Sequence, residues 1–310
     1  MRGKGAIVGG AYTRTMGTPL LIVSPQPRDL GGGFVVRRLL PSVRRAAVGP
    51  FVFFDHFGPL VAGPRDNHDV RPHPHIGLAT VTYLFEGAMM HRDSMGAVQR
   101  IEPGAINLMR AGAGVVHSER TPDDLRDKTR VNHGLQLWLA LPAADEEAAP
   151  AFTHTGAADI PAYEIGGASV RVLIGAAFGA ASPVPQYSPT LYLDITLSAG
   201  AAIDLPGGLA DEAALYTVDA PVKLDGAAVA AQRLALFDAG RTLRIEASEP
   251  ARVAIVGGAP LGQRHIWWNF VSSRRERIVQ AADDWAAQRF ARVPGETEFI
   301  PLPEKRPTAS

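Results

Sequence analysis

The sequence of 310 residues contains no cysteine. This absence excludes disulfide bonds, thiolate metal sites and cysteine nucleophiles, and it is typical of an intracellular protein. Histidine is also absent between His154 and His265, so the second half of the chain lacks the imidazoles needed for a histidine-based metal site. Any histidine-based metal site is therefore expected in the first half only.

An excess of charge of one sign and long apolar runs are also lacking. Lysine plus arginine and aspartate plus glutamate each number 31, so no overall charge attracts nucleic acid or an anionic membrane. No run approaches the ~20 apolar residues of a membrane-spanning helix. Gly9, Gly10 and Arg14 interrupt any apolar region suited to a signal peptide. The sequence predicts a cytoplasmic protein without direct contact to nucleic acid or membrane.

Two histidines stand in the stretch around which the chain is expected to be organised. Residues 71–84 include His73 and His75 and end in the β-branched and aromatic residues typical of a strand. Because side chains alternate along a strand, the two imidazoles share one face. Gly77 and Ala79 continue that parity, which predicts a wall of small side chains beside the imidazoles. A His-x-His pair is also common as a solvated or hydrogen-bonded surface feature, so this pair alone leaves both interpretations open.

A second fragment, residues 112–119, offers His117 and Glu119 at the same spacing. Two neighbouring strands, each with one such pair, would bring three neutral imidazoles and one carboxylate to one divalent ion. This set of nitrogen and oxygen ligands suits Fe(II), and also Mn, Co, Ni, Cu or Zn. The sequence therefore predicts a mononuclear site made of His73, His75, His117 and Glu119, with one or two positions left for water, substrate or dioxygen.

The order of these residues is similar to the cupin pattern. Gly87 and the turn at 103–104 separate the two pairs, as in two hairpin-linked motifs of one small barrel. Ordinary cupins carry a glutamate three or four residues after His-x-His, where this sequence has Ala79 and Thr80. The carboxylate appears instead at Glu119, and this variant resembles the pirin family.

The resemblance to pirins covers nearly the whole chain from about Pro25 onward. The segments that carry it, in pirin order, are 54–59, 71–84, Gly104, 111–119, 133–138, 189–194, 257–261 and 267–270. It implies an all-β bicupin, that is, two tandem cupin-type antiparallel β-barrels. It also implies iron as the bound metal.

Two classes of function follow from the resemblance. Pirins with quercetinase activity imply an oxidoreductase that dioxygenates a flavonol with O2, opens its heterocyclic ring and releases carbon monoxide. In that hypothesis Glu119 is also the base that accepts the 3-hydroxyl proton. The alternative is a non-enzymatic iron- and redox-sensing regulator that acts through a protein partner, such as a transcription factor or a metabolic enzyme. A metal-bearing scaffold without catalysis is the third interpretation.

Gln136 and Asp55 are the candidate substrate contacts. In residues 132–140 leucines alternate with Gln136 and Trp138, and a buried amide in so apolar a strand needs a hydrogen-bond partner. Asp55 and His56 follow a buried apolar run, and the sequence leaves open whether they line a pocket or cap a turn.

Structural roles are predicted for one further histidine and for a group of arginines. We expect His91 at a half-exposed hairpin position rather than as a fifth ligand, because four ligands already fill the first shell. The arginines favour a solvated strand edge blunted by charge over a phosphate-binding patch; they are Arg37, Arg38, Arg44 and Arg45.

The chain is expected to divide into four parts: a loosely held lead-in (1–30), the metal-binding barrel (31–145), a second cupin barrel without a metal site (160–290) and a tail (291–310) that is extended over the surface or disordered. Short strands separated by turn signals recur from 168 to 256, which predicts a second antiparallel barrel or sandwich. A capping box at 273–276 and the spacing of apolar residues up to Phe290 predict one C-terminal helix.

Overall fold

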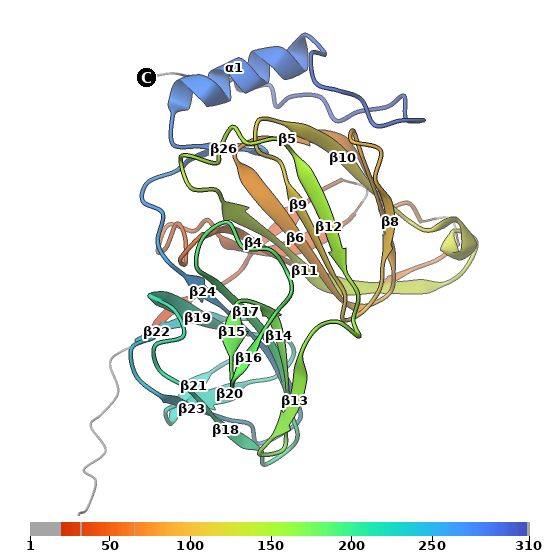
Figure 1. The fold of residues 1–310 in the computed structure, drawn as a ribbon. Helices are drawn as coiled ribbons and strands as arrows, with labels where there is room; N and C mark the ends of the chain where they lie inside the picture. The colour runs from red at the N-terminus through yellow and green to blue at the C-terminus, as the bar shows by residue number, and fades with distance from the viewer. Residues whose placement is uncertain (1–19, 32, 65, 309–310) are drawn as a thin grey trace, which may run out of the picture.

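The computed structural model describes residues 20–31, 33–64 and 66–308, and two antiparallel β-barrels make up most of the molecule (Figure 1). One α-helix, α1 (Arg275–Ala286), lies beyond the end of the first barrel. The predicted all-β fold with two barrels and one helix is confirmed. No helix in the described part of the chain is long and apolar enough to cross a membrane. Residues 1–19 of the predicted lead-in lie outside the described residues.

The first barrel is built from a seven-stranded and a four-stranded sheet. The larger sheet has the order β12 (Ala151–Thr155), β9 (Ile106–Arg110), β6 (Leu78–Glu86), β11 (Arg130–Ala140), β4 (Phe51–Ala62), β3 (Val35–Leu40), β2 (Gln26–Asp29). The smaller sheet has the order β5 (Val70–His75), β10 (Val115–Arg120), β7 (Met89–Asp93), β8 (Val98–Ile101). A 3-10 turn, η1 (Asp123–Leu125), follows β10.

The second barrel repeats this plan, as the cadence of short strands predicts. Its larger sheet has the order β1 (Leu21–Val23), β22 (Leu234–Phe237), β19 (Glu212–Thr217), β24 (Ala251–Gly258), β17 (Thr190–Leu197), β14 (Ala168–Ile174), β13 (Ala162–Ile165). Its smaller sheet has the order β18 (Ala202–Leu205), β23 (Leu243–Glu246), β20 (Val222–Leu224), β21 (Ala227–Val229). The strands β15 (Ala176–Ala177) and β16 (Ala180–Ala181) form a separate hairpin.

The two large sheets pack against each other, and one apolar core runs through the contact. Tyr83 of the first barrel and Tyr192 of the second are both buried in this core. The Tyr83 hydroxyl donates a hydrogen bond to Asp194 at 2.7 Å. Arg252 binds the same carboxylate from Nε at 2.9 Å. The carboxylate of Asp194 and the hydroxyl of Tyr83 are therefore paired, whereas the buried hydroxyl of Tyr192 has no hydrogen-bond partner among the described residues.

Both ends of the chain pack on the barrel that lies farther from them in sequence. At the N-terminal end, β1 lies within the predicted lead-in but pairs with β22 of the second barrel and buries Val23. At the other end, β25 (His265–Trp267), β26 (Phe270–Ser272) and α1 return to the first barrel. There Phe270 and Trp285 share a cluster with Ile76 and Val116. The division at 31–145 and 160–290 stays a prediction, because the ends of the chain cross it.

The predicted capping box is wrong, although the helix is present. The N-cap is Arg274, and no side chain caps the helix. Ser273 instead donates from its backbone nitrogen and its hydroxyl to the buried carboxylate of Glu146, at 2.8 and 2.9 Å. A tertiary partner has therefore replaced the local one. Phe290 lies beyond the end of α1.

Arg37 and Arg38 do not lie on a solvated edge, because their strand β3 lies between β2 and β4. Arg44 and Arg45 follow the end of β3, and Arg44 is exposed. Each of the four has a partner within the chain: Arg37 binds the carbonyl of Gly58, Arg38 the carboxylate of Asp55, Arg44 the carbonyl of Ile22 and Arg45 the carboxylate of Glu212. Their charge is thus used in packing the first barrel, in holding β1 and in joining the two barrels.

Candidate metal centre

The strands β5 and β10 lie side by side in the small sheet, as predicted for two neighbouring segments. Their register places His117 opposite His73 and Val115 opposite His75. The register shifts between His117 and Glu119, so Glu119 stands opposite Val70. Alternation along both strands gathers the four predicted residues on one side of the sheet.

The three imidazoles form a compact group. One ring nitrogen from each of His73, His75 and His117 lies within 4.8 Å of the others, and such a group could hold a metal ion. An oxygen of Glu119 lies 3.9 Å from Nε2 of His73, and the other lies 3.7 Å from Nδ1 of His117. The three histidines are buried, and the Glu119 side chain is 11% exposed.

The ring nitrogens and the carboxylate oxygen that lack hydrogen-bond partners at this site suit a bound cation. His73 Nδ1 donates to the carbonyl of Arg71 at 2.9 Å and His75 Nδ1 to that of Asn269 at 3.0 Å, which leaves the Nε2 lone pairs of both free. Nε2 of His117 and Oε2 of Glu119 are buried and have no hydrogen-bond partner among the described residues. Buried polar atoms are normally paired. Acceptor atoms of this kind, gathered at one place, would be satisfied together by a divalent ion.

Burial determines the protonation states of the three histidines and Glu119. It lowers the pKa of His73 to about 4 and also lowers the pKa values of His75 and His117 below the ordinary value. The imidazoles are therefore neutral at pH 7, as metal ligation requires. Burial also raises the pKa of Glu119 to about 8. A nearby cation favours the ionised carboxylate and would counter this effect.

A cavity of about 340 Å³ opens beside the imidazoles. One wall is the stacked pair of Phe53 and Trp138, whose ring centroids lie 3.8 Å apart with an angle of 10° between the ring planes. Both predicted substrate contacts, Asp55 and Gln136, also line it. The cavity is thus mostly apolar, with polar groups at a few places, which is the usual form of a small-molecule site.

The polar wall of the cavity is fixed by neighbours. Thr82 donates from its hydroxyl to Oε1 of Gln136 at 2.9 Å, which leaves the Gln136 amide nitrogen free to donate. Asp55 accepts two hydrogen bonds from Arg38, at 2.8 and 2.7 Å. The Arg38 guanidinium also lies over the Phe53 ring, 4.3 Å from its centroid.

Comparison with known families gives two matches. The Pirin family model matches residues 33–139, and that of the Pirin C-terminal cupin domain matches residues 192–291. The chain belongs to the pirin family. A pirin-like protein from Caulobacter vibrioides is 45% identical over 289 residues, which cover 92% of this chain and 99% of the relative.

Two solved structures share the fold of this chain. A crystal structure of quercetin 2,3-dioxygenase from Acinetobacter baumannii superposes with a TM-score of 0.85 and 31% identity, covering 94% of this chain and 98% of that chain. A second quercetin 2,3-dioxygenase structure from this organism has a TM-score of 0.82 and 25% identity, covering 89% of this chain and 99% of that chain. The bicupin fold expected of a pirin is confirmed.

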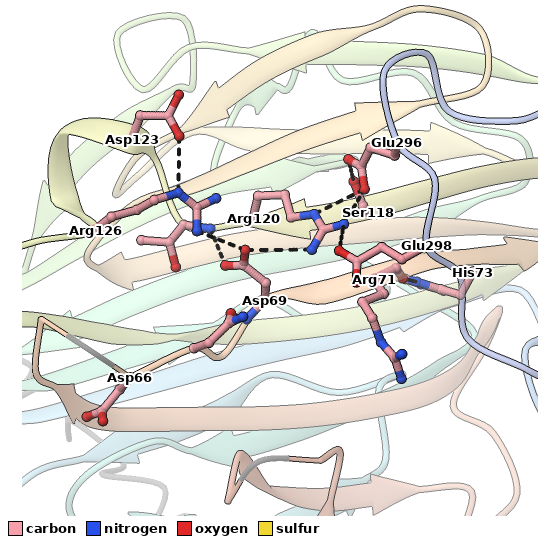
Figure 2. A network of polar contacts seen from close by, with 12 residues as sticks. Asp66, Asp69, Arg71, His73, Ser118, Arg120, Asp123, Arg126, Glu296 and Glu298 are labelled. Atoms are coloured by element: carbon pink, nitrogen blue, oxygen red, sulfur yellow. Dashed lines mark hydrogen bonds and ion pairs between the residues drawn. The ribbon is translucent and has the colours of Figure 1, made fainter.

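In this pirin the C-terminal segment 296–300 packs against the outer face of β10, the strand that carries His117 and Glu119 (Figure 2). Arg120 lies on that outer face and binds Glu296 and Glu298, the latter at 2.7 Å. Ser118, on the same face, donates to Glu296. Partly buried ion pairs of this kind hold the C-terminal segment against β10.

The same segment also reaches β5 and the cavity. The Ile300 backbone nitrogen donates to the carbonyl of Pro72 at 2.8 Å, and its carbonyl accepts from Nε1 of Trp285 at 3.0 Å. Ile300 then lines the cavity, as does Trp268 from the turn between β25 and β26. The pirin site therefore contains C-terminal residues that the sequence analysis did not include. Among the missed wall residues, Trp138 had a signal, because it shares a strand face with Gln136. Phe53 and Phe57 had the same signal, because they share a strand face with Asp55.

Two predictions about this part of the pirin barrel are wrong. His91 is only 5% exposed, because Phe152 of β12 stacks on its ring with centroids 4.3 Å apart. Gly77 and Ala79 do not line the cavity. Ala79 lies in the core between the barrels, and the missing side chain of Gly77 makes room for the backbone carbonyl of Val271.

Proposed function

We propose that this pirin binds one Fe(II) ion through His73, His75, His117 and Glu119 and catalyses quercetin 2,3-dioxygenase-type ring opening of a flavonol with O2. One observation carries the proposal: neutral imidazoles and a buried carboxylate meet beside an aromatic-walled cavity of about 340 Å³. The relatives from Acinetobacter baumannii named quercetin 2,3-dioxygenase support the reaction type. Fe(II) bound there supplies Lewis acidity and one-electron redox chemistry.

The cavity residues would bind and orient the flat substrate. The wall formed by Phe53 and Trp138 offers stacking contact to an aromatic ring system. The free amide nitrogen of Gln136 would donate a hydrogen bond to a substrate oxygen. The carboxylate of Asp55 would accept one from a phenolic hydroxyl, because Arg38 leaves it lone pairs on the cavity side. The Glu119 carboxylate would also take the 3-hydroxyl proton.

Oxygen uptake tests this function directly. Protein loaded anaerobically with Fe(II) is expected to consume one O2 for each quercetin and to release carbon monoxide, whereas the metal-free protein does neither. Parallel loading with Mn, Co, Ni, Cu and Zn identifies the metal that supports the highest rate. If no metal-loaded form consumes oxygen in the presence of quercetin, the enzymatic proposal is wrong and the iron-sensing regulator is favoured.

The replacement Glu119→Gln tests the proposed base. Glutamine retains an oxygen ligand but cannot accept a proton, so metal binding is expected to persist in part while the turnover rate falls about 10²–10⁴-fold, the usual contribution of a general base. Elemental analysis and oxygen uptake measure the two effects separately. Glu86→Gln, at an exposed position on β6, is the matched control. Unchanged turnover in Glu119→Gln would rule out the base role.

A further inference from the structure

The three histidines differ in the hydrogen-bond partner of their ring nitrogen Nδ1. His73 and His75 each donate from Nδ1 to a backbone carbonyl, that of Arg71 or Asn269. Among the described residues, no backbone carbonyl accepts a hydrogen bond from His117. Its Nδ1 faces Nδ1 of His91 at 3.4 Å, so its partner is another titratable side chain.

His91 is itself held by a buried carboxylate. It lies on β7, which pairs with β10 so that His91 is opposite Glu119 and Asp93 is opposite His117. Nε2 of His91 lies 3.1 Å from Oδ2 of Asp93, and Asp93 is fully buried. The other oxygen of Asp93 accepts hydrogen bonds from the backbone nitrogens of Met95 and Ala97, at 2.9 and 3.0 Å. The turn after β7 therefore fixes the carboxylate, and stacking on Phe152 fixes the ring of His91.

Only one set of proton positions satisfies these contacts with neutral imidazoles. The Asp93 carboxylate accepts the proton on Nε2 of His91, so Nδ1 of His91 carries a lone pair. That lone pair accepts the proton on Nδ1 of His117. Nε2 of His117 is then left as a free lone pair, and this is the buried atom without a partner among the described residues. The hydrogen bonds that link His117 through His91 to Asp93 thus leave the Nε2 lone pair of His117 available to a metal ion.

We propose that Asp93 and His91 are positioning residues that fix the tautomer of His117 and strengthen it as a metal ligand. The inference rests on the proposed metal site but concerns a role outside the four ligands. A hydrogen bond that ends on a carboxylate increases electron donation by the imidazole, and outer partners of this kind typically contribute 10–100-fold to metal affinity. Stronger donation favours the more highly charged ion, so the pair stabilises Fe(III) relative to Fe(II).

The replacement Asp93→Asn tests the tautomer argument. Asparagine keeps an oxygen for the two backbone nitrogens but turns an amide donor toward His91, which moves the His91 proton to Nδ1 and opposes the proton on His117. We expect Fe(II) and Zn(II) dissociation constants to rise about 10–100-fold. We also expect the Fe(III)/Fe(II) reduction potential to rise, by about 59 mV for each tenfold by which Fe(III) binding weakens more than Fe(II) binding.

A second variant separates positioning from packing. His91→Phe keeps an aromatic ring against Phe152 but removes both nitrogens, and it is expected to change affinity and potential in the same directions as Asp93→Asn. His154→Phe, on β12 and hydrogen-bonded to Asn107, is the matched control and is expected to leave both unchanged. A purely structural role would lower the melting temperature of the metal-free protein without shifting the potential.

The measurement distinguishes the two levels of the argument. Wild-type protein that binds neither Fe(II) nor Zn(II) would overturn the metal site and this inference together. Wild-type protein that binds metal, with Asp93→Asn and His91→Phe showing the same dissociation constants and reduction potential as wild type, would overturn the positioning role alone. Neither readout requires a known substrate.

Discussion

Replacing His75 with alanine is expected to abolish stable metal binding. The change removes one of the four proposed ligands and also the donor to the Asn269 carbonyl. Loss of a direct ligand should weaken binding by more than the 10–100-fold that loss of an outer partner costs. Metal content after dialysis is therefore expected to fall from one ion per chain to a trace, and quercetin-dependent oxygen uptake should fall with it.

The control for His75→Ala is His154→Ala, which removes an imidazole that lies outside the metal group. Elemental analysis of both variants, with circular dichroism to verify folding, gives the comparison. His75→Ala protein that retains a full equivalent of metal would mean that the ion is bound elsewhere. That result would remove the basis for assigning function to this cavity.

Replacing Gly77 with alanine is expected to cause a large loss of stability. Gly77 has φ of +67°, and a Cβ at this position would lie 1.9 Å from the backbone oxygen of Val271. Its own N–H donates to Gly112 and its carbonyl accepts from Leu141, at 2.8 and 3.2 Å, so the backbone is held on both sides. A strained backbone and an overpacked contact each cost about 1–3 kcal/mol. We expect the free energy of unfolding to fall by about 3 kcal/mol or more.

Gly200→Ala isolates the backbone part of this effect. Gly200 has φ of +79°, but a Cβ there would meet no atom within 4 Å. Denaturant unfolding of the metal-free proteins should therefore show a much smaller loss for Gly200→Ala than for Gly77→Ala. Equal losses would show that the approach of Val271 does not matter. Because Gly77 lies only two residues after His75, the last residue of β5, the Gly77 variant should also bind metal more weakly.

The grouping of the four candidate ligands could be predicted from sequence because it depends on alternation along two neighbouring strands. His73 and His75 share one face of their strand, and His117 and Glu119 share one face of theirs, whatever the rest of the fold. Pairing of the two strands then brings the four together. The second barrel could likewise be predicted. Short strands separated by turn signals at regular spacing are typical of an antiparallel barrel or sandwich in any sequence.

The remaining features depend on contacts between distant parts of the chain. The exposure of His91 depends on Phe152, from a strand that local pattern does not place beside it. The partner of His75 is a backbone carbonyl at Asn269, which no side-chain pattern reveals. The space beside Gly77 is filled by a later strand rather than left open as the small-residue pattern suggests. In each case the deciding neighbour is distant in sequence.

The contacts of the C-terminal segment 296–300 also affect when the site can form during protein synthesis. The strands that carry the proposed ligands end at Arg120, but Asn269, Glu296 and Ile300 complete their surroundings. A nascent chain synthesised only as far as Arg120 therefore contains the proposed ligands but not the segments that hold them in place. If the proposed site binds an ion, capture at full affinity is therefore expected only after residues up to Ile300 have emerged and folded.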